Sequence, residues 1–127
     1  MAKDTDADRA WKLMDKVSIC MLTTRDGQRL RSRPMAASPR PAENAVYFLT
    51  DARRHKDEEI EAHPEVCLCF ADTGGQKYVS VSGEAEVLND RAKISELWST
   101  VAHAWWDGPE DPNIRVPRVA PEEAEFW

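Results

Sequence analysis

The side chains best suited to chemistry in this sequence are basic residues that lie between positions 29 and 56. Arg29, Arg31 and Arg33 alternate along a strand-like run, so their side chains share one face of that strand. A second basic run at residues 53–56 opens a predicted helix, at the end where the helix dipole is already positive. A bound anion would neutralise both groups, and phosphate is the common anion at such a helix start. These two groups therefore predict a phosphorylated ligand.

The composition is that of one globular domain. The chain has 127 residues, of which 42% are hydrophobic and 31% are charged, and we expect a single domain over residues 1–127. No apolar stretch approaches the roughly 20 residues that cross a membrane. The first residues also lack the basic start and apolar segment of a secretory signal. We therefore expect a cytoplasmic protein with no membrane span.

The charge balance argues against nucleic acid as a partner. The formal net charge is -6 and the sequence pI is about 5.1. Binding to a phosphate backbone needs a basic face with several contacts, and the arginine stripe is too small for that role. The basic residues are thus expected to serve a small anionic ligand.

The cysteines and histidines do not form a recognisable catalytic or metal motif. Cys20, Cys67 and Cys69 lie inside apolar strand-like runs, and an odd number of cysteines argues against a disulfide framework. Cys67 and Cys69 share a strand face, but no further His or Cys pair follows at metal-ligand spacing. We expect buried structural cysteines, no metal site and no hydrolytic triad.

Short strands and inserted helices are expected to position the basic residues. Strands are predicted at residues 17–24, 28–35, 45–50, 65–71, 77–88 and 114–119. Helices are predicted at residues 8–16, from about 53 to 62, and from a cap at 89 or 90 to about 100. The Asp26-Gly27 pair predicts a hairpin, whereas residues 38–44 carry only turn residues. This pattern favours a mainly β, six-stranded antiparallel barrel with flanking helices over a parallel sheet.

Two residues are expected to interrupt their strands. Pro34 has no backbone donor, so the arginine strand should be bulged or lie at a sheet edge there, which leaves backbone groups free for a ligand. Gly83 is the expected bend in the strand at residues 77–88, whose apolar and polar residues alternate most clearly.

The tryptophans at positions 98, 105 and 106 are expected to differ in whether they lie in the core or contact another molecule. Trp98 lies on the apolar stripe of its predicted helix and is expected in the core. Trp105 and Trp106 are adjacent, so both cannot face the same core. One of these two side chains is therefore predicted to meet a ligand or a partner chain.

Taken in order, the motifs resemble those of the pyridoxamine 5'-phosphate oxidase-related flavoproteins, and within them the general stress protein 26-like branch. They span nearly the whole chain. The motifs are Met21-Leu22-Thr23-Thr24, Arg31-Ser32-Arg33-Pro34-Met35, Phe48-Leu49-Thr50-Asp51 with Lys56, residues 79–85, Asp90-Arg91, Leu97-Trp98, residues 104–106, Gly108 with Asp111-Pro112, and Glu125-Phe126-Trp127.

The resemblance implies an FMN-binding split β-barrel that pairs as a homodimer, with FMN in a groove at the subunit interface. By matching position, it implies that Arg33 and Lys56 hold the phosphate, with Arg31 and Arg54 as helpers. The other residues it places at the cofactor are Pro34, Met35, Leu49 and Thr50 along the ring, His55 as a further contact, and Trp98, Trp105 and Trp106 reaching the partner's flavin.

The resemblance also implies a flavin-dependent oxidoreductase with a stress-related role. The related oxidases have a small hydroxyl residue where this chain has residues 53–55, and the segments by which they recognise pyridoxamine phosphate are not evident here. Two alternatives stay open at this point. One is a flavin-binding or flavin-sensing protein that does not turn over, and the other is a binder of a different phosphorylated cofactor, such as a deazaflavin or pyridoxal phosphate.

Overall fold

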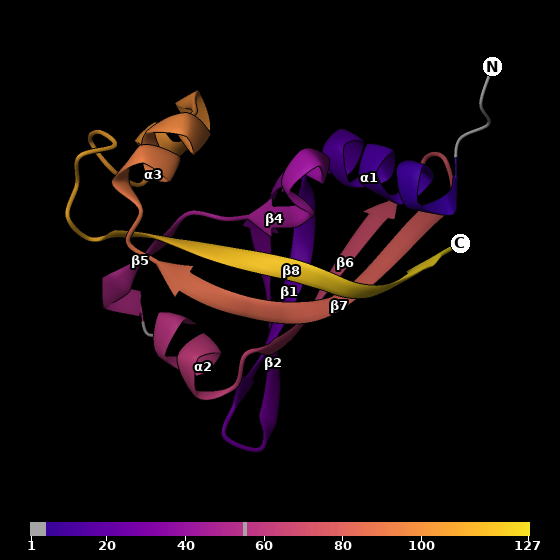
Figure 1. The fold of residues 1–127 in the computed structure, drawn as a ribbon, viewed down its shortest axis with the longest axis horizontal. Helices are drawn as coiled ribbons and strands as arrows, with labels where there is room; N and C mark the ends of the chain where they lie inside the picture. Colours follow the sequence, from indigo (N-terminus) through magenta and orange to yellow (C-terminus); the bar gives the residue numbers. More distant parts are fainter. Residues whose placement is uncertain (1–4, 55) are drawn as a thin grey trace.

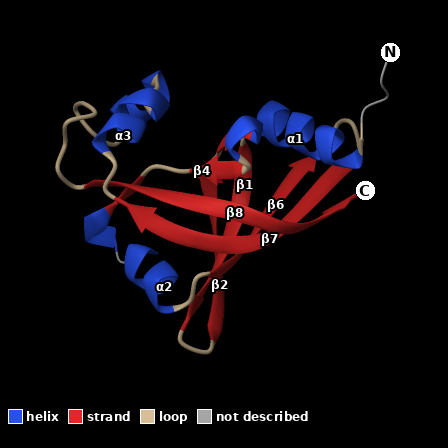
Figure 2. Cartoon of the chain, viewed as in Figure 1, coloured by secondary structure: helices blue, strands red, loops and turns tan. Residues whose placement is uncertain are grey.

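A computed structural model describes residues 5–54 and 56–127, and shows an antiparallel sheet flanked by short helices (Figures 1 and 2). Its strands are β1 (Ile19–Asp26), β2 (Arg29–Ala36), β3 (Ser38–Arg40), β4 (Ala45–Tyr47), β5 (Thr50–Asp51), β6 (Glu65–Asp72), β7 (Lys77–Leu88) and β8 (Ile114–Phe126). Its α-helices are α1 (Asp6–Val17), α2 (Lys56–Ala62) and α3 (Arg91–Leu97), and its 3-10 turns are η1 (Pro41–Glu43), η2 (Ala52–Arg54) and η3 (Thr100–Ala104).

The strand order along the sheet is β2-β1-β6-β7-β8-β4-β3, with β5 paired to β8 off this path. Every strand pair among the described residues is antiparallel, as the hairpin signals predict. The sheet does not close on itself, because β2 and β3 end the path. Pro34 therefore lies in an edge strand, which confirms one of the two placements predicted for it.

The described residues form eight strands where the sequence predicts six, and the two additional short strands are β3 and β5. Residues 38–40 were expected in a turn, but they pair with β4, since backbone partners supplied by the fold override turn-like composition. The strand predicted at residues 45–50 divides into β4 and β5. The division lies opposite Pro117 of β8, which has no N–H for the ladder and only accepts a hydrogen bond from the Phe48 N–H at 3.0 Å.

Strand β8 is longer than the predicted 114–119 because its acidic end pairs with β7. Glu123 and Glu125 lie opposite Ser82 and Ser80, on a face of the sheet where charged side chains stay solvated. A register shift between Ser82 and Gly83 confirms the predicted bend in β7.

The helix boundaries follow from local caps. Asp90, one of the two predicted caps, is the N-cap of α3, because its side chain accepts a hydrogen bond from the Lys93 N–H at 3.0 Å. This helix ends at Leu97, before the predicted residue 100. The helix predicted from residue 53 begins instead at Lys56, because the Asp51 carboxylate accepts the Arg53 N–H at 2.9 Å and draws residues 52–54 into a 3-10 turn.

The described part of the chain contains two apolar clusters. The larger packs α1 and α2 against the inner face of β1, β6 and β7, with Leu22, Leu68 and Phe70 almost completely buried. The smaller packs α3 and η3 against β4 and β8, and it includes Trp106 and, at its margin, Trp98. No helix among residues 5–54 and 56–127 is long and apolar enough to cross a membrane.

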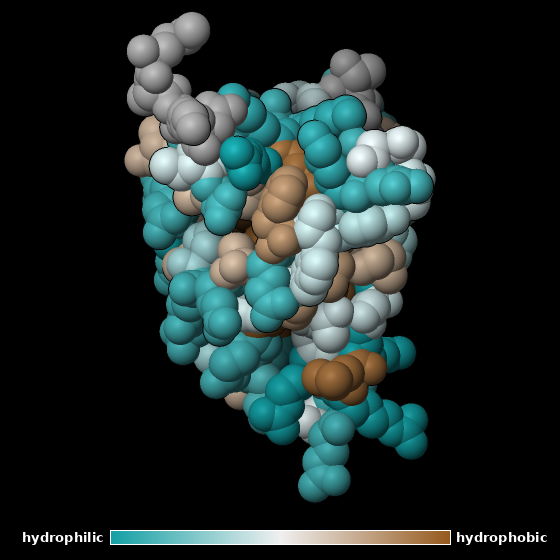
Figure 3. All heavy atoms as spheres, turned by 90° about the vertical axis from the view of Figure 1, so that its right-hand side faces the viewer, coloured by the Kyte–Doolittle hydropathy of each residue, from teal (hydrophilic) through white to brown (hydrophobic). Residues whose placement is uncertain are grey.

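The outer face of the sheet carries most of the large apolar side chains that the fold leaves exposed. By strand register, the same face of the sheet presents Leu30 of β2, Met21 and Ile19 of β1, Tyr78 of β7, and Trp127 just after β8. Leu30, in the β1–β2 hairpin, is 72% exposed. Figure 3 shows an apolar group among hydrophilic side chains at the end of the molecule where Figure 1 places this hairpin. Such a face is typical of a surface that another molecule covers.

The cysteines are only partly where the sequence predicts them. Cys20 is buried as expected, but Cys69 is exposed and Cys67 is half-buried. These two residues point to the outer face of β6, which has no layer of helices over it among the described residues. The prediction of three buried cysteines is therefore wrong for Cys69.

Candidate functional site

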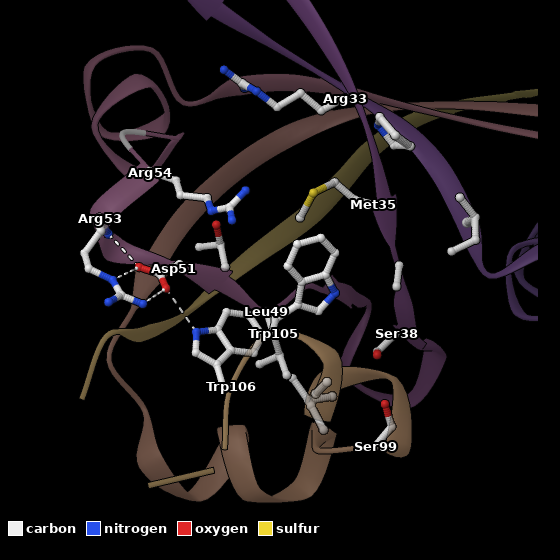
Figure 4. A pocket seen from close by; sticks show the side chains of 16 residues that line it. Arg33, Met35, Ser38, Leu49, Asp51, Arg53, Arg54, Ser99, Trp105 and Trp106 are labelled. Carbon is white, nitrogen blue, oxygen red and sulfur yellow. Dashed lines mark hydrogen bonds and ion pairs between the residues drawn. The ribbon is translucent and has the colours of Figure 1, made fainter. Parts of the chain in front are cut away.

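A cavity of about 690 Å³ opens between the edge strand β2, the β5–η2 segment and residues 97–106 (Figure 4). This volume lies within the range of roughly 300–1,000 Å³ that is typical of small-molecule sites. Its walls combine apolar side chains such as Met35 and Leu49 with Arg33, Arg53 and Arg54. The cavity therefore offers an apolar surface for a ring and cations for an acidic group.

Arg33 is held at the rim of the cavity by a carboxylate from α2. Its two terminal nitrogens donate to the two oxygens of Glu59 at 2.9 and 3.0 Å, and one of them also donates to the Thr24 hydroxyl at 3.2 Å. Thr24 is fully buried and donates to Glu59 at 2.8 Å. The hydrogen bonds from Arg33, and then that from Thr24, hold the pKa of Glu59 below its ordinary value. This network fixes the guanidinium in one orientation.

Asp51 joins the two sides of the cavity. Its carboxylate accepts hydrogen bonds from the Arg53 side chain, from the Arg53 N–H, and from the Trp106 indole N–H at 3.1 Å. The Arg53 guanidinium, followed by the Arg53 and Trp106 N–H groups, holds the pKa of Asp51 well below its ordinary value. Trp106 is only 8% exposed, so this contact ties a buried wall residue to the β5–η2 segment.

Arg54 and Trp105 face each other at the mouth of the cavity. The guanidinium carbon of Arg54 lies 5.4 Å from the centre of the Trp105 ring, within cation–π distance. The Trp105 side chain is 63% exposed. Figure 4 shows Arg54 directed toward this ring and Arg53 directed toward Asp51.

Most of the side chains predicted for the site line this one cavity. Those that do are Arg33, Pro34, Met35, Leu49, Thr50, Arg54, Trp105 and Trp106. The structure also adds wall residues that the sequence did not indicate, among them Ile19, Asp51, Arg53 and Leu97. The closest signal for Asp51 and Arg53 was their opposite charge at a spacing of two residues beside a predicted strand end.

Other predicted site residues lie elsewhere or cannot be placed. Arg31 does not line the cavity, and it pairs with Asp26 at 3.3 Å and with Glu59 at 3.6 Å. Trp98 is not part of the cavity wall either. It packs against the smaller apolar cluster, as its helical stripe predicts, and its indole N–H donates to His103 at 3.2 Å. His55 and the side chain of Lys56 lie outside the described residues.

The adjacent tryptophans divide as predicted, with Trp106 buried and Trp105 exposed. Both line the cavity of their own chain. Their predicted contact with a partner's flavin stays a prediction.

The basic groups are neutralised differently from what the sequence predicts. The sequence indicates an external anion as the simplest counter-charge. In the structure, Glu59 pairs with Arg33, Asp26 and Glu59 pair with Arg31, and Asp51 pairs with Arg53. The partner of Arg33 comes from a helix 26 positions further along the chain, whereas Asp51 lies only two residues before Arg53. Among the described residues, Arg54 is the cation of the cavity that has no carboxylate partner.

The described residues contain no group of three or more His, Cys, Asp and Glu side chains that could hold a metal ion. The charged side chains of the cavity wall are Arg33, Asp51, Arg53 and Arg54.

Comparison with known proteins places this chain among proteins of similar sequence and fold. A family model described as pyridoxamine 5'-phosphate oxidase like matches residues 5–127. General stress protein 26 of Bacillus subtilis strain 168 is 33% identical over 81 residues, which cover 61% of this chain and 58% of that protein. The chain thus spans less than two thirds of the length of this curated relative.

Solved structures of the same group have the same fold. General Stress Protein 26 from Bacillus anthracis strain Sterne superposes with a TM-score of 0.85 at 21% identity, over 94% of this chain and 91% of that one. The general stress FMN/FAD binding protein from Xanthomonas citri gives a TM-score of 0.82 at 24% identity, over 94% of this chain and 85% of that one. These likenesses confirm the predicted antiparallel split barrel.

Proposed function

This chain belongs to the pyridoxamine 5'-phosphate oxidase-like family, among the relatives of general stress protein 26, and on this premise we propose that it binds FMN and acts as a flavin-dependent oxidoreductase. The observation that carries the proposal is the cavity in which arginines and tryptophans meet between β2 and the β5–η2 segment. A solved relative in Xanthomonas citri is named as an FMN/FAD binding stress protein, which supports flavin as the ligand and a stress-related role.

The residues present fit a phosphorylated flavin. Arg54 lines the cavity and can receive the phosphate, and Arg33 can still donate to it from the two N–H groups that its bonds to Glu59 and Thr24 leave unused. The resemblance assigns Lys56 to the same group. The apolar walls formed by Met35 and Leu49 suit a planar ring. A bound flavin would supply electron and hydride transfer.

The protein's own contribution is to hold and orient the ligand. The edge position of β2 leaves backbone groups around Pro34 and Met35 open toward the cavity rather than paired with a further strand. The hydrogen bonds of Glu59 to Arg33 and of Asp51 to Trp106 keep the walls in place before a ligand arrives. Such preorganisation lowers the cost of binding.

A binding experiment with flavins tests this proposal. We expect the purified protein to bind FMN with the absorption spectrum of a bound flavin, and to bind deazaflavin and pyridoxal phosphate more weakly. Arg33→Ala and Lys56→Ala should each weaken FMN binding by about 1.5 to 3 kcal/mol, the strength of a charge-assisted hydrogen bond. Isothermal titration calorimetry measures these affinities, and thermal melting shows whether each variant is folded.

The outcomes separate the possible functions. Reduction of the bound flavin by a reduced nicotinamide, followed by repeated turnover with an acceptor, supports an oxidoreductase. Flavin binding without turnover points to a carrier or sensor. Preference for deazaflavin or pyridoxal phosphate over FMN would refute the flavin assignment.

We also propose that the chain forms a homodimer through the outer face of its sheet, with the cavity at the interface. Met21 and Ile19 on β1 and Leu30 on β2 are exposed on the same face of the sheet, with Leu30 nearer the hairpin. Ile19 also lines the cavity, together with Pro34 and Ala36 from the same face. A second copy on this face would therefore cover apolar surface and close the cavity at once.

Substituting a charged residue for Met21, on the outer face of the sheet, tests whether this face forms the dimer interface. Met21→Glu should convert the dimer to a monomer, because an isologous interface would bury two unpaired carboxylates. Ala92→Glu adds the same charge on the exposed surface of α3 and should leave the dimer intact. Light scattering after size exclusion gives the mass. A parent protein that is monomeric, or a Met21→Glu variant that stays dimeric, would contradict the proposal.

A further inference from the structure

Building on the proposed flavin site, we infer that Arg54 is the residue that selects a phosphorylated ligand, and that Trp105 holds Arg54 in place until the phosphate arrives. Arg54 and Trp105 thus form a specificity pair at the mouth of the cavity. The ligand class is a phosphate monoester of a planar aromatic compound, since an anion and a ring are the partners that a guanidinium and an indole take.

The arginines that line the cavity differ in their partners. Arg33 already donates to both oxygens of Glu59, and Arg53 already donates to both oxygens of Asp51. The positive charge of each is offset by a carboxylate that stays in place. No carboxylate among the described residues pairs with Arg54, so its charge remains available to an incoming anion.

To bind an anion, Arg54 must give up its contact with Trp105. Its contact in the structure is with the ring of Trp105, at 5.4 Å from the ring centre. The ring is 63% exposed, and a cation–π contact at such a site is weaker than charge-assisted hydrogen bonds to a phosphate. A phosphate therefore draws Arg54 away from Trp105 at small cost. Leaving the ring costs roughly a two- to fivefold factor in affinity.

Trp105 affects phosphate binding through Arg54. The apolar walls of Met35 and Leu49 can take the ring of a ligand whether or not that ligand carries a phosphate. The phosphate is bound by Arg54, and the contact with Trp105 weakens that binding slightly because Arg54 must leave the ring.

The test compares FMN with riboflavin, which lacks the phosphate. The ratio of the two affinities isolates the phosphate, because ring contacts are common to both ligands. Arg54→Ala should lower this ratio at least tenfold by weakening FMN while leaving riboflavin unchanged. Trp105→Leu should raise the ratio roughly two- to fivefold, because Arg54 no longer has a ring to leave. In the double variant the ratio should equal that of Arg54→Ala.

A control and a second probe make the result decisive. Arg9→Ala removes an exposed arginine from α1, outside the cavity, and should leave the ratio unchanged. Inorganic phosphate alone should change the tryptophan fluorescence of the parent protein, but not that of Trp105→Phe or Arg54→Ala. This readout needs no flavin, so it applies even if FMN and riboflavin both fail to bind and the proposed function falls.

Two results would overturn the inference. One is an FMN-to-riboflavin ratio in Arg54→Ala that stays within twofold of the parent value. The other is a parent protein whose tryptophan fluorescence does not respond to phosphate.

Discussion

Gly83→Ala is expected to destabilise the protein by about 3 kcal/mol or more, at the upper end of what overpacking costs. A Cβ atom at Gly83 would lie 2.2 Å from the carbonyl oxygen of Ala120 and 3.1 Å from the Cα of Pro121. Both atoms belong to the backbone of β8, so no side chain can move aside. Strand β8 also pairs with β4 and β5, so a displaced β8 disturbs the wall of the cavity as well.

Chemical unfolding followed by circular dichroism measures this loss. Gly74→Ala is the matched control, because a Cβ there would meet only the Asp72 carboxylate oxygen at an ordinary 3.8 Å. We expect the control to differ from the parent by less than about 1 kcal/mol. Equal stability of the Gly83 and Gly74 variants would show that β8 can shift without cost, contrary to the close approach of these strands.

Asp51→Ala is expected to cost about 2 to 4 kcal/mol of stability and to abolish most flavin binding. The carboxylate satisfies the Arg53 backbone N–H and the Trp106 indole N–H, and the latter is buried. Removing it leaves these donors without a partner. Most of the Arg53 side chain is exposed to solvent, which limits the penalty for the freed charge. Trp106 would lose the bond that ties it to the opposite side of the cavity.

The measurements for this variant are the free energy of unfolding and the affinity for FMN. Asp107→Ala serves as the control, because it removes an exposed carboxylate next to Trp106 without breaking a described hydrogen bond. A folded Asp51→Ala protein that binds FMN as tightly as the parent would refute the role of Asp51 as the link between the two cavity walls.

The hydrogen bonds of Asp51 also predict how the free energy of unfolding changes with pH. The pKa of Asp51 is lowered in the folded protein, so its network stabilises the fold fully above the ordinary carboxyl value of 3.8. As the pH falls below that value, the stabilisation is lost. The difference in unfolding free energy between the parent and Asp51→Ala should thus be constant near neutral pH and shrink only in acid.

Much of the fold follows from patterns that neighbouring residues make along the chain. The alternation in β7 sets which side chains of residues 79–87 face the core, because strand side chains repeat every two residues. The side chain of Asp90 begins α3 by bonding a backbone N–H three residues ahead. Pro34 marks an edge strand because it lacks an N–H wherever the strand is placed. Each of these effects acts within a few residues, so the order of amino acids suffices to predict it.

The arrangement of the site depends on contacts between distant segments. Glu59 meets Arg33 across 26 positions, and Asp51 meets Trp106 across 55. No local pattern specifies these partners, because their meeting depends on where packing leaves α2 and the segment after η3. The sequence therefore identifies the basic residues and tryptophans as candidates for a phosphate and a ring. The folded chain determines that Arg33 and Arg53 are already neutralised and that Arg54 remains for a ligand, since the charge available at a site depends on every group around it.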